Sequence, residues 1–299
     1  MVKYLVFIFG IVLLVGCSGG GSTKGSTDSA TSGAIKISVD ESLKPLVDAE
    51  IQAFEGLYPN ASITPLYVPE AEAIRLLIID SVRLAVLTRA LNADESKQIE
   101  EQKYVNHISR VAREGIALIV SKNNPDTLWE MSKVKSVLSG ANPDQKIVFD
   151  HQNSSIARFV RDSLLNGATL PANTFAAGTN EAVVDYISKD KKAVGLIGVS
   201  WISDRDDSVA NRFLGSINVV GLKNEGQDDY YKPYQAYIAQ KFYPLTRDIV
   251  INIREGRAGL GTGFTSFVAG EKGQRIILKA GLVPATMPIR LVQIRREAL

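Results

Sequence analysis

Cysteine is almost absent from this sequence: Cys17 is the single one in 299 residues. A chain with one cysteine cannot form an intrachain disulfide, so its stability must come from packing. Histidine is nearly as scarce, and neither His107 nor His151 is spaced with cysteine or carboxylate as a zinc site requires. The Gly-x-Ser-x-Gly, His-Glu-x-x-His and Cys/His patterns of common hydrolases are also missing. We therefore expect no metal, no cofactor and no enzymatic activity.

Neither sign of charge predominates, and long apolar runs are confined to the N-terminus. The 34 Lys and Arg residues against 32 Asp and Glu residues give a formal net charge of +2. This balance shows neither the basic footprint of a nucleic-acid-binding protein nor an acidic, solvating tail. After the first 16 residues, no apolar stretch approaches the length that spans a bilayer. We expect no nucleic-acid partner.

The N-terminus has the organisation of a lipoprotein signal peptide. Lys3 supplies a short positive region, residues 4–15 are apolar but too short to cross a membrane, and a small residue precedes Cys17. This predicts residues 1–16 as the signal peptide and Cys17 as the lipid-modified N-terminus; the alternative is an ordinary signal peptide that contains a cysteine. Residues 17–33, rich in Gly, Ser and Thr, are expected to form a flexible tether. The protein is therefore expected in the cell envelope, lipid-anchored and extracytoplasmic, in the periplasm or at the cell surface.

Beyond the tether, about 265 residues show short apolar strands that alternate with amphipathic helices. Residues 34–39 alternate as a strand does, and apolar residues then recur at helical spacing from residue 43 to residue 54. Asn92 and Glu95 have the spacing of a capping box. This order predicts an α/β fold with a parallel, doubly wound sheet. Further strands are expected at residues 62–68, 83–88, 115–121, 147–149, 193–199, 217–222 and 289–294, and further helices at 70–79, 132–138, 156–165, 182–187 and in a last stretch ending at 279.

Two polar, turn-rich stretches divide this pattern into two units. Residues 123–125 separate the first series of elements from a second, and residues 223–229 lead the chain back to the first. The order predicts two lobes joined by two crossovers, with a hinged cleft between them. Lobe 1 is expected to comprise residues 34–120 plus 235–299, and lobe 2 residues 121–234.

Six segments carry a further signal: residues 40–54 (DESLKPLVDAEIQAF), 81–91 (SVRLAVLTRAL), 113–125 (REGIALIVSKNNP), 193–199 (AVGLIGV), 242–247 (FYPLTR) and 264–282 (FTSFVAGEKGQRIILKAGL). In this order they resemble the phosphate-binding receptors of bacterial phosphate ABC transporters, over essentially all of residues 34–299. The resemblance implies a two-lobed periplasmic-binding-protein fold of type II, with the ligand between the lobes. It also implies inorganic phosphate or a related oxyanion as ligand and an ABC permease of the inner membrane as partner. We expect a monomer.

The first binding loop of that family is a strand, a Gly-Ser-Thr-Thr-like turn and a helix. The matching turn here is residues 39–42, where Ser42 keeps a hydroxyl donor but Asp40 and Glu41 depart from the pattern. Backbone N–H groups at the start of the helix would still attract an anion. Ser42 is thus a candidate ligand-binding residue, although simple capping of the helix would also explain it.

The second loop of the family has a Ser-Gly pair, and the matching residues 69–72 have neither a hydroxyl nor a glycine. They carry Glu70 instead. A carboxylate can accept a hydrogen bond from phosphate, which is protonated near neutral pH, and would repel sulfate, which is not. Glu41, Glu70 and Glu72 are therefore candidate selectivity residues. The alternative is a solvated acid at a helix start, where acids are favoured.

The third and fourth loops supply the other candidates. Thr88 and Arg89 match a ligand-binding strand end; Thr88 can donate its hydroxyl, and Arg89 can hold an oxyanion through two parallel hydrogen bonds. An arginine at a strand end can also be a plain surface charge. The fourth loop matches polar residues before a helix, which would cradle an anion or simply cap the helix, and Phe149 stands where the family has an arginine. The candidates there are Asn153, Ser154, Ser155 and Arg158.

Three functions are compatible with these residues. The first is a receptor that captures phosphate or a related oxyanion for an ABC importer, as the hydroxyl and arginine candidates suggest. The second is a non-transport envelope lipoprotein that keeps the fold for protein interaction or sensing with a decayed pocket, as the missing glycines and added acids suggest. The third is an enzyme acting on phosphorylated material, for which no set of nucleophile, base and metal can be assembled.

Overall fold

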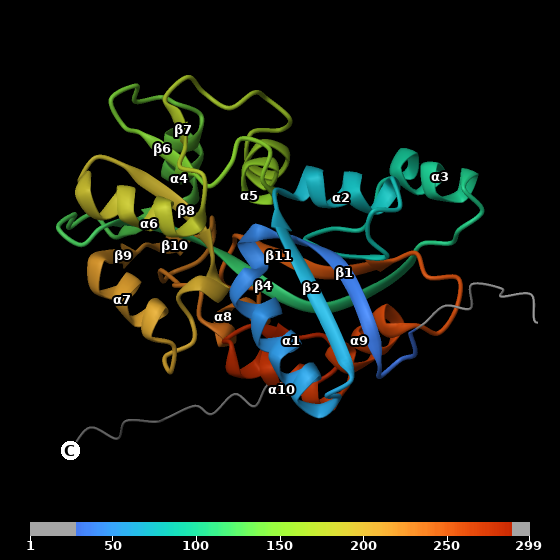
Figure 1. Ribbon diagram of the computed structural model, residues 1–299. Helices are drawn as coiled ribbons and strands as arrows, with labels where there is room; N and C mark the ends of the chain where they lie inside the picture. Colours follow the sequence, from blue (N-terminus) through green and yellow to red (C-terminus); the bar gives the residue numbers. More distant parts are fainter. Residues whose placement is uncertain (1–27, 289–299) are drawn as a thin grey trace, which may run out of the picture.

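The computed structural model describes residues 28–288, which form two α/β lobes that share one long strand (Figure 1). The predicted signal peptide, Cys17 and most of the predicted tether lie outside the described residues, as does the strand expected at residues 289–294. The shared strand is β4 (His107–Ser121). Its residues 107–115 pair with β11 (Thr246–Ile253) in the first lobe, and its residues 116–120 pair with β8 (Val194–Gly198) in the second.

The first lobe is a sheet covered by helices on both faces. The strand order is β2-β1-β3-β11-β4, in which β1, β2 and β3 are parallel and β11 runs antiparallel to both of its neighbours. Figure 1 shows α1, α9 and α10 on one face and α2 on the other. The elements are β1 (Gly33–Asp40), η1 (Glu41–Leu43), α1 (Lys44–Leu57), β2 (Ala61–Val68), α2 (Glu70–Ile78), β3 (Leu84–Leu87), α3 (Ala93–Glu101), α9 (Leu260–Ala269), α10 (Glu271–Lys279) and β12 (Val283–Pro284).

The second lobe is built around β8, with β6 beside it and β4 on its other side. Alternate residues of the apolar end of β4 enter two different cores: Ala117 and Ile119 pack with α6, and Ile116 and Leu118 with α4 and α5. A strand covered on both faces explains that continuous apolar run. The other elements are β5 (Leu128–Glu130), α4 (Met131–Leu138), β6 (Ile147–Phe149), α5 (Ser155–Phe159), the π-helix η2 (Val160–Leu164), β7 (Thr174–Ala176), α6 (Asn180–Lys189), η3 (Val199–Trp201), α7 (Ser208–Ser216), β9 (Ile217–Val219) and β10 (Gly221–Lys223). The helix that follows, α8 (Gln235–Ala239), contacts β4 and β12.

The expected two-lobed α/β architecture is confirmed, with differences in detail. The sheet of the first lobe is not wholly parallel, because β11 and β4 run antiparallel to each other within it. The single strand expected at 217–222 is two strands, β9 and β10, that pair with different partners, β4 and β5. The expected last helix is divided at Gly270 into α9 and α10. Strands and α-helices that the periodicity did not indicate are β5, β7, α7, α8, β11 and β12.

Local signals account for several boundaries. Asn92 accepts a hydrogen bond from the backbone N–H of Glu95 and the Glu95 carboxylate accepts one from Asn92, so the capping box at the start of α3 is present in both directions.

The chain is already fixed at Asp28: its carboxylate accepts from the backbone N–H of Leu260 at 2.9 Å and pairs with Arg83 at 3.1 Å. The last residues of the segment expected to be a tether therefore contact the first lobe.

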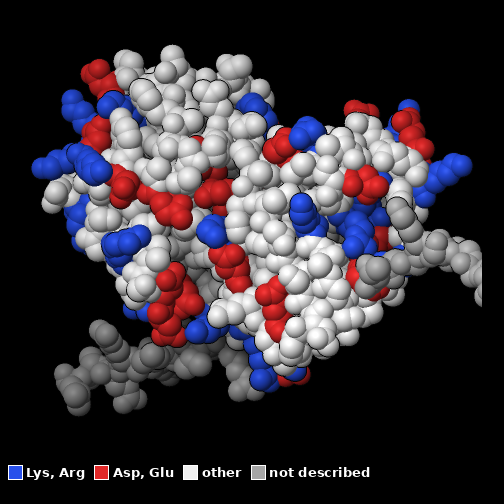
Figure 2. All heavy atoms as spheres, in the orientation of Figure 1, with Lys and Arg blue, Asp and Glu red and all other residues white. Residues whose placement is uncertain are grey.

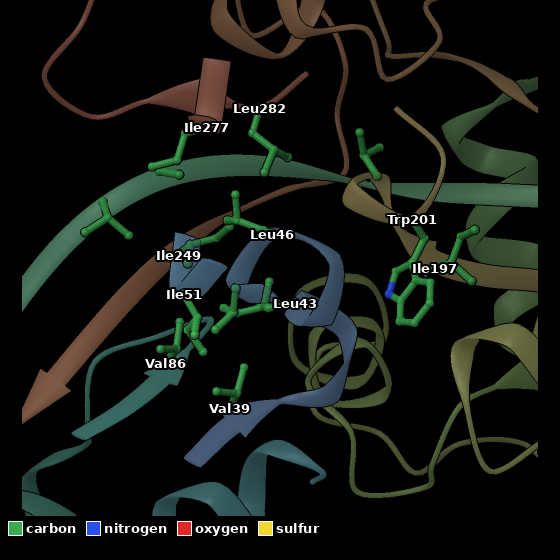
Figure 3. Packing of buried hydrophobic residues seen from close by; sticks show 14 of the residues in the cluster. Val39, Leu43, Leu46, Ile51, Val86, Ile197, Trp201, Ile249, Ile277 and Leu282 are labelled. Atoms are coloured by element: carbon green, nitrogen blue, oxygen red, sulfur yellow. The ribbon is translucent and has the colours of Figure 1, made fainter. Parts of the chain in front are cut away.

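An apolar core continues from one lobe into the other near β4. Figure 3 shows Ile197 and Trp201 of the second lobe beside Leu43 and Leu46 of the first, all within one cluster of buried side chains. The indole nitrogen of Trp201 points toward the turn before Leu43 and donates to the backbone oxygen of Ser42 at 2.9 Å. This contact holds the end of β1 in place at the border of the lobes.

Candidate functional site

Hydroxyl groups from the two lobes meet where β1 ends and α5 begins. Ser42 in η1 and Ser155, the first residue of α5, are both fully buried, and their Oγ atoms lie 3.4 Å apart. Both positions follow the end of a strand, β1 and β6 respectively, which is where α/β folds place their ligands. The structure thus brings together two of the residues that the sequence indicated.

A buried arginine joins these hydroxyls. Arg247 donates from Nη1 to Ser155 Oγ at 2.6 Å and from Nη2 to Ser42 Oγ at 2.8 Å. Its Nε and Nη2 donate to Glu114 Oε1 at 2.9 and 2.6 Å. The pair is set by register, because Arg247 of β11 is directly opposite Glu114 of β4. Burial raises the pKa of Glu114, and the guanidinium of Arg247 opposes that shift.

Asp40 provides an internal acceptor for the same hydroxyls. At the end of β1, its Oδ1 accepts from the backbone N–H and the Oγ of Ser42 at 2.9 and 2.6 Å. Burial and the nearby carboxylate of Glu70 raise the pKa of Asp40 to about 6, although Arg247 and Ser155 oppose the shift. Asp40 therefore takes a proton at a higher pH than an ordinary aspartate does, just below neutral pH.

A second set of contacts crosses the lobes beside the first. The Oε1 atom of Glu70 accepts from the N and Oγ1 of Thr88 at 2.9 and 2.6 Å, and Oε2 accepts from Nε of Arg158 at 2.6 Å. Arg158 also donates from Nη2 to Thr88 Oγ1 at 2.9 Å. Glu70 and Thr88 belong to the first lobe and Arg158 to the second. Figure 1 shows the corresponding helices, α2 and α5, beside each other.

Arg89 lies at the edge of this cluster, and its main partner is Glu95. Its Nη1 and Nη2 donate to the two carboxylate oxygens of Glu95 at 2.7 and 2.8 Å. Its Nε is 3.8 Å from Glu70 Oε2, and the side chain is 26% exposed. The two parallel hydrogen bonds expected from Arg89 are thus made to a carboxylate of α3.

Glu41 reaches the second lobe as well. Its carboxylate accepts from the side-chain and backbone N–H groups of Asn180, the first residue of α6. A carboxylate at a helix N-terminus is favoured by the orphan N–H groups and the helix dipole. Burial and the carboxylate of Asp150 nevertheless raise the pKa of Glu41 to about 7, while Asn180 opposes this.

The candidates of the fourth loop differ in burial and in the partners that they contact. Ser154 is buried and caps α5, since its Oγ accepts from the backbone N–H of Ala157 at 3.2 Å. Asn153 is exposed and lies outside the cluster. Only Ser155 and Arg158 of that loop reach the residues of the first lobe.

The sequence reasoning missed Arg247, Glu114 and Asn180. Arg247 was within the segment FYPLTR that carries the family resemblance, but no periodicity indicated β11 or its register with β4. The available signal was weak: Arg247 and Glu114 each stand beside an apolar run, and a charged residue is rarely buried without a partner. Gly198 also belongs here: an added Cβ would lie 3.1 Å from the Ser42 oxygen and 3.2 Å from Glu114 Oε2.

The site is rich in buried carboxylates. Asp40, Glu41, Glu70, Glu114 and Asp150 are at most 8% exposed, against two arginines, Arg158 and Arg247, that face them. Figure 2 shows more acidic side chains over α6, at the border with the first lobe. Within residues 28–288, no group of three or more His, Cys, Asp or Glu side chains is arranged to hold a metal ion. Hydroxyl, guanidinium and carboxylate groups can bind a protonated oxyanion, which both donates and accepts.

A cavity of about 230 Å³ lies away from this cluster, beside the crossovers. It is lined by residues such as Lys122, Leu214 and Tyr234 and includes none of the clustered side chains. The hydroxyls and charges of the site are instead in direct contact with one another.

Among the described residues, no helix is long and apolar enough to cross a membrane.

Comparison with known proteins assigns the fold to a family. The profile of the PBP superfamily domain (periplasmic-binding proteins) matches residues 24–272. The chain belongs to the PBP superfamily. The cluster of Ser42, Ser155 and Arg247 lies at the border between the two lobes of this fold.

Named relatives agree with this family. A phosphate-binding protein PstS from Staphylococcus haemolyticus is 21% identical over 265 residues, which are 83% of this chain and 80% of that protein. A solved structure from Clostridium perfringens, described as a phosphate ABC transporter substrate-binding protein with bound phosphate, covers 85% of this chain and 100% of its own at 19% identity and a TM-score of 0.69. An ABC-type phosphate transport receptor from Vibrio cholerae covers 84% and 100% at 18% identity and a TM-score of 0.62.

Proposed function

We propose that this protein is an extracytoplasmic solute-binding protein that captures phosphate or a related oxyanion between its lobes. The observation that carries the proposal is the meeting of Ser42 and Ser155, from opposite lobes, on one buried guanidinium, Arg247. Such a meeting of hydroxyls and a fixed positive charge is a chemical match for an oxyanion. The names of the similar proteins, which bind phosphate, support the same ligand class.

Each candidate then has a role that follows from its position. Ser42, Thr88 and Ser155 would donate hydroxyl hydrogen bonds, while Arg158 and Arg247 would supply charge from the two lobes. Ser154 would act indirectly by fixing the start of α5. Arg89 would contribute only a positive charge near the site, since its Nε lies 3.8 Å from Glu70 Oε2.

A second function is favoured by the same contacts. Because Asp40 and Glu70 already accept hydrogen bonds from Ser42, Thr88 and Arg158, the site is compatible with an envelope protein that keeps the fold for interaction or sensing.

Calorimetric titration with phosphate, sulfate and simple organophosphates distinguishes the receptor from this second function. The test form lacks residues 1–16 and carries Cys17→Ser, so that every described residue is kept. Binding of phosphate supports the receptor, and absence of binding for phosphate, sulfate and simple organophosphates favours the second function.

Arg158→Ala is expected to weaken phosphate binding roughly ten- to a hundredfold, or about 1.5–3 kcal/mol. The substitution removes the guanidinium that reaches Glu70 and Thr88 from the second lobe. Titration of the variant with inorganic phosphate measures the effect.

The matched control is Arg161→Ala, three residues farther on, in the π-helix that follows α5. Arg161 is 42% exposed and pairs with the neighbouring Asp162, so its loss is expected to leave the affinity within about twofold. Equal losses in the two variants would show that Arg158 acts only through the general charge of the lobe.

Attachment to the envelope is the other part of the proposal. A lipid on Cys17 would hold the protein at a membrane, where an ABC permease could receive the ligand. Cys17→Ser is expected to release the protein into the soluble fraction or to leave an uncleaved precursor, as fractionation and mass spectrometry of the N-terminus would show. A mature protein that begins elsewhere and fractionates as soluble without the substitution would contradict the lipid anchor.

A further inference from the structure

The carboxylate of Glu70 is bound by the protein in the way that proteins bind a free oxyanion. One oxygen accepts from a backbone amide and a hydroxyl of Thr88, at 2.9 and 2.6 Å, and the other from a guanidinium nitrogen of Arg158 at 2.6 Å. The hydroxyl is itself held by Arg158 at 2.9 Å. An amide, a hydroxyl and a guanidinium together are the usual donors of a phosphate or sulfate site.

This contact joins the two lobes through one buried and one partly buried side chain. Glu70 begins α2 in the first lobe and is 2% exposed, whereas Arg158 lies on α5 in the second lobe and is 24% exposed. Burial raises the pKa of Glu70, but Arg158 and Thr88 lower it by more, so the carboxylate stays ionised. Separation of the lobes would have to break this charge-assisted, partly buried hydrogen bond.

The position of Glu70 is not explained by the preference of helix starts for acids. That preference would be met by Glu72, which lies in the same first turn and pairs on the surface with Arg75 at 2.7 Å. Glu72 is 36% exposed. Glu70 instead turns inward and uses donors of both lobes.

We propose that Glu70 is a built-in anionic occupant of the site, which holds the lobes together and competes with the oxyanion for Thr88 and Arg158. This inference rests on the proposed function, because it assigns the same donors to the ligand. A ligand must therefore displace Glu70, and only an anion that binds both lobes better than one carboxylate can do so. Glu70 thus sets the affinity threshold of the site and keeps weak anions out.

The test compares Glu70→Gln, which removes the charge, and Glu70→Ala, which removes the side chain, with Glu72→Gln as the control. The form without residues 1–16 and with Cys17→Ser is titrated with inorganic phosphate, and its radius of gyration is measured by X-ray scattering with and without phosphate. Both Glu70 variants are expected to bind phosphate on the order of ten- to a hundredfold more tightly than the parent. Glu70→Ala is expected to be more expanded than the parent before phosphate is added and to become compact with it. Glu72→Gln is expected to match the parent.

The possible results separate the inference from the proposed function. If the parent binds phosphate and the Glu70 variants bind it equally or less tightly, the inference is overturned and the proposed function stands; weaker binding would make Glu70 a direct contact of the ligand. If only the Glu70 variants bind phosphate, the inference is supported and the parent is not a phosphate receptor. Absence of binding in every form overturns both. A radius of gyration unchanged in Glu70→Ala rules out the role in joining the lobes.

Discussion

Arg247→Met is expected to lower the free energy of unfolding by about 3–5 kcal/mol and to abolish phosphate binding at millimolar concentrations. Arg247 and Glu114 are 6% and 0% exposed, so loss of the guanidinium leaves a carboxylate buried without its partner. The same substitution removes the donors to Ser42 and Ser155 at 2.8 and 2.6 Å. Urea denaturation and calorimetric titration measure the two effects separately.

The double substitution Arg247→Met with Glu114→Gln separates stability from binding. It removes both charges, so most of the lost stability is expected to return, whereas phosphate binding is not. The surface pair of Arg75 and Glu72, 2.7 Å apart and largely exposed, is the control, and Arg75→Ala is expected to cost less than about 1 kcal/mol. An Arg247 variant as stable as the Arg75 variant would contradict this expectation, because it would mean that Glu114 stays buried without its partner at no cost in stability.

The sequence predicts the lobes well where one local pattern determines one element. The capping box of Asn92 and Glu95 and the apolar end of β4 are examples, because side-chain spacing alone specifies them. The family resemblance adds the order of the elements. The turn at Ser42 and the start of α5 at Ser155 were placed in this way, and the structure brings their hydroxyls to 3.4 Å.

The partners of the charged residues could not be predicted, since they depend on the register of strands distant in sequence. Glu114 and Arg247 are opposite each other only because β11 returns antiparallel beside β4. Arg89 illustrates the same difficulty: its local position suits an anion, but the capping residue Glu95 of the next helix receives its guanidinium. A short polar motif indicates what a side chain can bind, while the tertiary fold decides what it does bind.

A different buried acid, Glu50, affects stability rather than the site. It lies on the apolar face of α1 with Leu46, Val47, Ile51 and Phe54, and it is 1% exposed. Neither of its carboxylate oxygens has a hydrogen-bond partner among the described residues. Burial alone raises the pKa of Glu50 to about 9. The folded protein therefore holds this group in its neutral form over the physiological range.

Glu50→Gln is expected to raise the free energy of unfolding by about 3 kcal/mol at pH 7. Below the ordinary pKa of 4.5, both folded and unfolded chains carry the proton, and the substitution should have little effect. As the pH rises from about 4.5 to about 9, the unfolded chain loses the proton and the folded chain keeps it, so the parent is destabilised by about 1.4 kcal/mol per pH unit. The glutamine variant lacks this slope.

Urea denaturation of both proteins at pH 5, 6, 7 and 8 tests this directly, because the difference in unfolding free energy should widen steadily with pH. Glutamine has a similar shape and also leaves a buried polar group unpaired, so the comparison isolates the ionisation. The control is Glu101→Gln on α3, since Glu101 is exposed and its substitution should give a difference that is small at every pH. A constant difference for Glu50→Gln between pH 5 and pH 8 would show that Glu50 titrates normally in the folded protein, through a water molecule or a local opening of α1 that gives it access to solvent.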